Sequence, residues 1–163
     1  MKKDETTKQR ILSEALKLFA SKGYEAVSVA QIAGAVGIKA PSLYKHYESK
    51  RDIFHSIVAE VERLETLRSA DLKLPEGSMQ EMAAGFCAVS MEGLKKYCRN
   101  MLLHWMEEPF MCDFRRMLVL EQYHDDEMGK LYDRYFVTGP VGYMSELFAV
   151  MTGADCDAGQ LAV

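Results

Sequence analysis

The sequence lacks the features that define several classes of protein. No apolar run is long enough to cross a bilayer, and the N-terminal segment MKKDETTKQR lacks the apolar core of a signal peptide. The four cysteines never form a C-x-x-C pair, so the sequence predicts neither a zinc site nor a dithiol redox motif. We therefore expect a cytoplasmic protein without a membrane segment, in which the cysteines are small buried side chains.

Motifs of catalysis are also scarce. The sequence has no glycine-rich phosphate loop and no nucleophile motif. Two groups could bind a metal or transfer protons, namely His104 with Glu107 and Glu108, and the run HDDE at 124–127. The run HDDE is better explained as the start of a helix, because acidic side chains favour the first turn. We interpret His104 as a hydrogen-bond donor in a pocket or as a core histidine. We expect no enzyme, no metal and no cofactor.

Charge is unevenly distributed along the chain, whose net charge is -4. Residues 1–51 contain ten Lys or Arg and five Asp or Glu, whereas residues 52–163 contain ten and nineteen. A basic N-terminal segment on an acidic remainder favours a polyanionic partner that meets the N-terminal segment alone. The alternative is a solvated surface with uneven charge.

The N-terminal third predicts short helices. Ser28 and Gln31 form a capping box, so a helix should begin at Val29 and end at Gly37. Before it, a helix ending at Gly23 carries these apolar residues on one face: Ile11, Leu12, Ala15, Leu16 and Phe19.

A third and a fourth helix follow. Pro41 suits the first turn of a helix, and Ser49 with Asp52 predicts a helix start at Lys50 that runs to Ala70. Two short helices joined by a tight turn around Gly37 predict a helix-turn-helix, whose second helix can lie in the DNA major groove.

Residues 6–54 resemble the DNA-binding domain of the tetracycline-repressor (TetR) family. The segments LFASKGY, SVAQIAGAVGI, SLYKHY and SKRDIF occur in the order and at the spacing of that family. The resemblance implies an all-α protein, with a three-helix helix-turn-helix domain at 1–52 and a helical ligand-binding and dimerisation domain at 53–163. It also implies a recognition helix from about Lys39 to Tyr47.

The resemblance carries over to single residues at the predicted DNA interface. Ser28 could bind a phosphate as well as cap its helix, Lys45 could contact a guanine or a phosphate, and Lys50 could hold a phosphate at a helix N-terminus. His46 matches a backbone-contact position, with a half-buried histidine as the alternative, and Tyr47 is expected to pack beneath the helix. The predicted DNA-binding residues are Ser28, Lys39, Ala40, Pro41, Ser42, Tyr44, Lys45, His46 and Lys50.

Ala30 and Ala40 depart from the family pattern. Some members carry long polar side chains at these positions, and an alanine can contact a thymine methyl but cannot form a bidentate hydrogen bond to a base. The operator sequence therefore cannot be inferred from these residues.

The segment DLKLPEGS at 71–78 predicts a loop, and the helical spacing of apolar residues after it predicts an all-α body. We expect helices near 78–106, 108–124 and 125–151, the first weakly interrupted at Gly93 and the third kinked or broken by Gly139, Pro140 and Gly142.

Ten of the eleven methionines lie in this body together with many aromatic residues, a composition that suits a pocket for a flat or apolar ligand. Each such residue taken alone is better interpreted as core. Because the resemblance implies an inducer pocket, we predict these lining residues: Trp105, Phe114, Met117, Tyr123, Tyr132 and Tyr135.

The resemblance further implies a homodimer on a palindromic operator of double-stranded DNA, acting as a repressor that a small hydrophobic or aromatic inducer releases. The alternative is a regulator without a ligand, whose body only dimerises or binds a protein. Family members dimerise through their last two helices, and the segment MTGADCDAGQLAV leaves room for part of one. We expect that the chain is truncated at its C-terminus or, if complete, that its dimer interface is unconventional.

Overall fold

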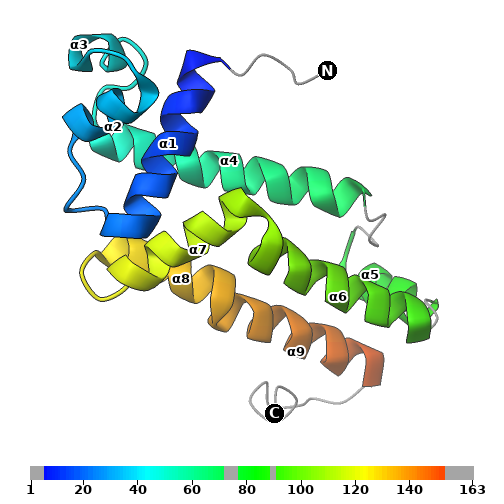
Figure 1. Ribbon diagram of the computed structural model, residues 1–163. Coiled ribbons are helices and arrows are strands. Elements are labelled where there is room, and N and C mark those ends of the chain that lie inside the picture. Colours follow the sequence, from blue (N-terminus) through cyan, green and yellow to red (C-terminus); the bar gives the residue numbers. More distant parts are fainter. Residues whose placement is uncertain (1–5, 72–76, 89–90, 153–163) are drawn as a thin grey trace.

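The computed structural model describes residues 6–71, 77–88 and 91–152, and over these residues it contains helices and no strand (Figure 1). The predicted all-α fold is confirmed. Three helices near the N-terminus form a head, α4 runs from the head along a helical body, and five further helices build that body. The head helices are α1 (Thr7–Lys22), α2 (Val29–Val36) and α3 (Ala40–Leu43). The others are α4 (Lys50–Asp71), α5 (Met79–Ala88), α6 (Met91–Glu107), α7 (Pro109–Glu121), α8 (Asp126–Phe136) and α9 (Thr138–Thr152).

The first two helices begin and end where local sequence rules place them. The Ser28 hydroxyl accepts a hydrogen bond from the Gln31 N–H, and the Gln31 side-chain oxygen accepts one from the Ser28 N–H, so α2 begins at Val29 as predicted. It ends at Gly37, whose φ of 77° is left-handed and favours glycine. The α1 side chains Ile11, Ala15, Leu16 and Phe19 are buried as predicted.

The predicted recognition helix is shorter than expected. Its α-helical part spans only Ala40–Leu43, and the chain then continues in tighter turns in which the His46 N–H donates to the Leu43 carbonyl at 2.8 Å. Leu43 is fully buried and Tyr47 is 2% exposed, so these two side chains fix the segment to the core. The prediction that Tyr47 packs beneath the helix is confirmed.

Helix α4 joins the head to the body. It begins at Lys50, where the Ser49 hydroxyl accepts a hydrogen bond from the Asp52 N–H at 3.0 Å. The expected domain boundary at 52/53 falls inside this helix, and one hydrophobic core crosses it. That core contains Phe54 and Ile57 of α4 together with α1 residues such as Phe19 and α7 residues such as Met117.

The body contains more helices than predicted. The segment expected as 78–106 forms α5 and α6, with residues 89–90 outside the described part. The segment expected as 125–151 breaks at Val137, before the predicted glycines. A Cβ at Gly139 would overlap the carbonyl of Arg134, so glycine allows α9 to begin this close to α8. The loop residues 72–76 and the C-terminal residues 153–163 lie outside the described part.

The cysteines are less buried than expected. Cys112 is buried, but Cys87 and Cys98 are exposed because they lie on the outer faces of α5 and α6, and Cys156 lies outside the described residues. Over the part of the chain that the structure describes, no helix is both long enough and apolar enough to cross a membrane.

We expect Ser28→Ala to lower the free energy of unfolding by about 1 kcal/mol, because it removes the oxygen that caps α2. Urea denaturation followed by circular dichroism measures this change. Ser21→Ala is the matched control, since the Ser21 hydroxyl only donates to the Leu18 carbonyl within α1. Equal losses in the two variants would contradict the capping role.

Candidate nucleic-acid interface

The α3 segment presents polar side chains on the face opposite its buried anchors. Tyr44 is 53% exposed, and Lys39, Pro41, Lys45 and His46 are also exposed. The exposure of His46 rules out the half-buried alternative. Ala40 and Ser42 are partly buried, and Ala40 packs on the core. Five of the predicted contacts on this segment are therefore accessible to a partner, and they include both hydrogen-bonding groups and positive charge.

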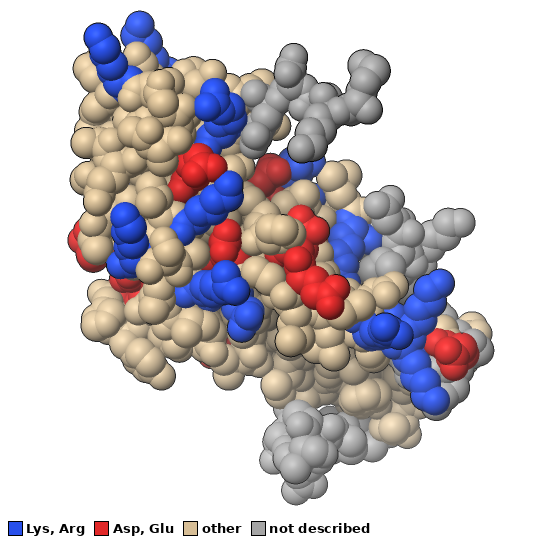
Figure 2. Space-filling model, viewed as in Figure 1, with Lys and Arg blue, Asp and Glu red and all other residues tan. Residues whose placement is uncertain are grey.

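Basic side chains project from the end of the molecule that carries α3 (Figure 2). The acidic side chains visible on this face begin below that end, over α1 and beside the loop between α1 and α2, and continue along the body. This arrangement agrees with the uneven charge along the sequence, and it would direct a polyanion to the head.

Ser28 and Lys50 lie at helix N-termini near this surface. Ser28 is exposed and caps α2, as predicted. Lys50 has partners within the chain that sequence reasoning missed: its Nζ donates to the Tyr24 carbonyl at 2.8 Å and lies 4.2 Å from the centre of the Tyr24 ring. An ammonium has three N–H donors, so these contacts are compatible with a phosphate contact.

Two basic residues of α1 also support the α3 segment, and sequence reasoning missed both. The Lys8 ammonium lies 5.1 Å from the centre of the Tyr47 ring, and the Tyr47 hydroxyl donates to the Lys8 carbonyl at 3.2 Å. Arg10 Nη2 donates to the Val36 carbonyl at the end of α2, at 2.8 Å. Lys8 and Arg10 are two positions apart in α1, a spacing that forms no recognisable motif. The sequence therefore does not reveal their partners, which lie 39 and 26 positions away.

The start of α4, which follows the head, is bonded to the body by an ion-pair network with the start of α8. Arg51 donates to Asp125 at 2.8 Å and also to Glu127, and His55 Nε2 lies 3.2 Å from Glu127. The Arg51 hydrogen bond lowers the pKa of the Asp125 carboxyl below its usual value, although partial burial opposes this shift. Asp125 also caps α8 by accepting from the Met128 N–H, which confirms that HDDE starts a helix.

Four of the predicted ligand-pocket residues form one aromatic cluster with Phe136. The ring centre of Trp105 lies 5.7 Å from that of Tyr135 and 4.8 Å from that of Phe136. Phe114 lies 5.6 Å from Tyr135, and Tyr132 lies 5.6 Å from Phe136. These distances are typical of packed aromatic pairs. The cluster joins α6, α7 and α8.

The two remaining predicted residues, Met117 and Tyr123, lie outside these ring contacts. Met117 is fully buried in the core. Tyr123 is 88% exposed in the turn between α7 and α8, so its assignment to the pocket is wrong. Its aromatic character suggested a pocket, but α7 ends at Glu121 and the next turn directs the ring outward.

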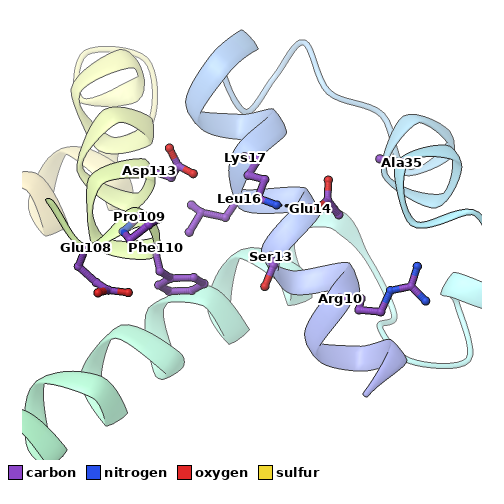
Figure 3. A pocket seen from close by; sticks show the side chains of 10 residues that line it. All are labelled: Arg10, Ser13, Glu14, Leu16, Lys17, Ala35, Glu108, Pro109, Phe110 and Asp113. Atoms are coloured by element: carbon purple, nitrogen blue, oxygen red, sulfur yellow. Dashed lines mark hydrogen bonds and ion pairs between the residues drawn. The ribbon is translucent and has the colours of Figure 1, made fainter. Parts of the chain in front are cut away.

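Two cavities lie away from this cluster. A cavity of about 340 Å³ lies between α1, α2 and the start of α7, where charged and apolar side chains mix (Figure 3). Its walls are Arg10, Ser13, Glu14, Leu16, Lys17, Ala35, Glu108, Pro109, Phe110 and Asp113. A shallower hollow is lined by Gln122, Asp126, Gly129, Lys130 and Asp133. Neither contains any of the six predicted pocket residues.

The residues considered for catalysis have other partners. His104 Nε2 lies 2.6 Å from Glu65 of α4 rather than against Glu107 or Glu108. Within residues 6–71, 77–88 and 91–152, no group of three or more His, Cys, Asp or Glu side chains is placed to hold a metal ion.

The fold and the exposed α3 segment define a helix-turn-helix protein. Residues 11–57 match the family model described as bacterial regulatory proteins of the tetR family. This match confirms the resemblance of the N-terminal residues to that family.

Curated relatives agree with this family. The HTH-type transcriptional repressor ComR of Escherichia coli K12 is 35% identical over 78 residues, which cover 47% of this chain and 37% of ComR. The repressor BdcR of the same strain is 32% identical over 94 residues, which cover 56% of this chain and 45% of BdcR. The matched part of the chain thus spans less than half the length of either repressor.

A solved structure shows the same fold over more of the chain. The crystal structure of a protein assigned to the TetR family, from Mesorhizobium loti MAFF303099, has a TM-score of 0.59 and 21% identity. It covers 90% of this chain and 68% of that protein. At this identity the likeness concerns the fold alone.

We expect Tyr47→Phe to reduce the loss of stability at alkaline pH. Burial, with the Asp52 and Glu60 carboxylates as further causes, raises the pKa of Tyr47 from 10.0 to about 12. The unfolded chain therefore releases this proton first, and stability falls as pH rises from about 10 to 12. Urea denaturation across this range measures the slope. The fall of the unfolding free energy with pH should be shallower in Tyr47→Phe than in the original protein. Tyr44→Phe is the control, because its ring is exposed. Equal slopes in Tyr47→Phe and the original protein would contradict the prediction.

Proposed function

We propose that the chain is a sequence-specific transcriptional regulator that binds a palindromic operator as a cytoplasmic homodimer and represses transcription. The observation that carries the proposal is the α3 segment, which is fixed to the core by Leu43 and Tyr47 and exposes Tyr44, Lys45 and His46. The names of the relatives ComR and BdcR support repression. In such a dimer the two α3 segments enter successive major grooves about 34–36 Å apart.

Each predicted contact has a role in this proposal. Lys39, Lys45, His46 and Lys50 contribute positive charge or N–H donors to phosphates, and the Ser28 hydroxyl donates to a phosphate at the α2 N-terminus. Ser42 and Tyr44 carry the hydroxyls that contact bases. Ala40 and Pro41 allow close approach to the groove, since neither has a long side chain.

The first test is fluorescence anisotropy of the protein titrated onto duplex from upstream of its own gene and onto a scrambled duplex, at several salt concentrations. We expect a preference of about a thousandfold or more and strong weakening by salt. A dimeric protein that binds neither duplex would overturn the proposal. If the two duplexes bind equally, selection from a random duplex library finds the operator, and its failure to enrich any sequence excludes specific binding.

Two variants separate base contacts from phosphate contacts in the same experiment. Ser42→Ala and Tyr44→Phe should weaken operator binding by about fivefold or more and scrambled binding much less, because each removes one hydroxyl that reads a base. Ser21→Ala, on the body side of α1, should change neither. Equal losses on both duplexes would make Ser42 and Tyr44 phosphate contacts.

We further propose that a small hydrophobic or aromatic ligand enters the body at the aromatic cluster and releases the DNA. The cluster of Trp105, Phe114, Tyr132 and Tyr135 supports this assignment, because aromatic side chains on three helices meet there. The ligand would act by favouring a conformation whose α3 segments no longer match successive grooves. A ligand-bound protein that binds its operator unchanged would contradict this mechanism.

Trp105 is the single tryptophan of the chain, so its fluorescence reports on this cluster. We expect 1-anilinonaphthalene-8-sulfonate, used as a flat apolar probe, to quench Trp105 emission and to take up its energy. Tyr135→Ala should change the apparent affinity of the protein for this probe several-fold. Tyr123→Ala, in the exposed turn, should leave that affinity unchanged. Probe binding that leaves Trp105 emission unchanged would place the ligand elsewhere.

One observation favours the alternative of a regulator without a ligand. The rings of the cluster contact one another, and Phe114 and Met117 are fully buried, as in an ordinary core. A body that only dimerises or binds a protein partner would give no ligand-induced rise in melting temperature.

A further inference from the structure

Tyr24 connects the body to the candidate DNA interface through its backbone. Its N–H donates to Glu121 Oε1 at 2.7 Å, and its carbonyl oxygen accepts from Lys50 Nζ at 2.8 Å. Glu121 ends α7 in the body, and Lys50 begins α4 beside the head. One residue of the loop between α1 and α2 therefore lies between a carboxylate of the body and a predicted phosphate contact.

Glu121 is buried to a degree that is rare for a carboxylate. It is only 5% exposed, and a carboxylate removed from water requires hydrogen-bond donors. The Tyr24 N–H supplies one. The neighbouring Gly23 has a φ of 84°, and a Cβ there would lie 2.8 Å from Glu121 Oε1. The absence of a Cβ at Gly23 therefore leaves room for the carboxylate at its observed position.

The Lys50 ammonium is held from the other side of Tyr24. Besides the Tyr24 carbonyl, Nζ lies 3.5 Å from the Glu25 carbonyl and 4.2 Å from the centre of the Tyr24 ring. Two of its three donors therefore face the loop, and the third can bind a phosphate. The direction of that third N–H depends on where the Tyr24 carbonyl lies.

We infer that Glu121 is a positioning residue for DNA binding, which fixes the Tyr24 backbone so that Lys50 points to a DNA phosphate. The inference rests on the proposed function. It predicts an effect of unusual sign: removing a negative charge ordinarily strengthens binding to a polyanion, whereas loss of Glu121 should weaken it.

The test compares three variants by fluorescence anisotropy on the operator and on a scrambled duplex. Glu121→Met keeps the side-chain volume but offers no oxygen to Tyr24, Glu121→Gln keeps an acceptor, and Asp126→Asn removes an exposed charge nearby. We expect Glu121→Met to weaken binding to both duplexes by about tenfold and to lower the salt slope by about one, the same effect that we expect of Lys50→Ala. Glu121→Gln should restore binding, and Asp126→Asn should leave it unchanged or tighter.

A double variant separates positioning from a general loss of stability. Lys50→Ala should cost little further affinity in the Glu121→Met background, since Lys50 is already misplaced there. Additive losses, or Glu121→Met that binds as tightly as the original protein, would overturn the inference. Circular dichroism checks that each variant folds, and Glu121→Ala replaces Glu121→Met if the latter melts early.

A second measurement needs no DNA. Acetic anhydride acetylates free lysine amines, and mass spectrometry gives the rate at Lys50. We expect this rate to rise several-fold in Glu121→Met and to stay near the original in Glu121→Gln, because only the first releases the Tyr24 carbonyl. An unchanged rate overturns the inference. If the original protein binds no DNA, the proposed function fails, and the acetylation rates still decide whether Glu121 positions Lys50.

Discussion

The packing of α1 against α7 determines where the DNA-binding head lies on the body. This pair shares the most extensive contact between described helices, and both contribute fully buried side chains to one core, among them Ile11, Phe19, Phe114 and Leu118. Burying each large apolar side chain stabilises this contact by about 1.5–3 kcal/mol. This stabilisation has little directionality. The hydrogen bonds and ion pairs at its edge are directional, so they set the orientation that the apolar core leaves open.

These directional contacts all reach the segment where α7 ends and α8 begins. Glu121 bonds to the Tyr24 N–H, and Asp125 bonds to Arg51 at the start of α4 while it caps α8. Helix α8 also carries Tyr132 and Tyr135 of the aromatic cluster. Under the proposed function, a ligand that displaced these rings would move the same helix whose first turn is bonded to the head. A rigid helix is a sufficient connection between the two sites, because its hydrogen-bonded turns move together.

The sequence predicted the head well because its determinants are local. The capping box at Ser28 and Gln31, the left-handed Gly37 and the proline at 41 each act within four residues. By contrast, Tyr24 bonds to Glu121 across 97 positions of sequence, and Arg51 bonds to Asp125 across 74. No periodicity in the sequence reveals such partners. Tyr123 was misassigned for a related reason, since residue type indicates what a side chain can contact but not which way a turn directs it. The break at Val137 accompanies the close approach of Gly139 to the Arg134 carbonyl, which the glycines and proline of this segment indicate only approximately.

Under the proposed function, the internal contacts of Lys50 would help it to bind a phosphate. A free lysine side chain loses about 2 kcal/mol of rotamer entropy when it is fixed in one conformation. Lys50 is already ordered by the carbonyls of Tyr24 and Glu25 and by the Tyr24 ring, so most of this loss has occurred before any phosphate arrives. Under the proposed function, the same contacts would make the affinity for DNA depend on the loop between α1 and α2, and through Glu121 on the body. A contact that is preorganised in this way can be strengthened or lost by a small movement of its support, which is a property that a regulated DNA-binding protein requires.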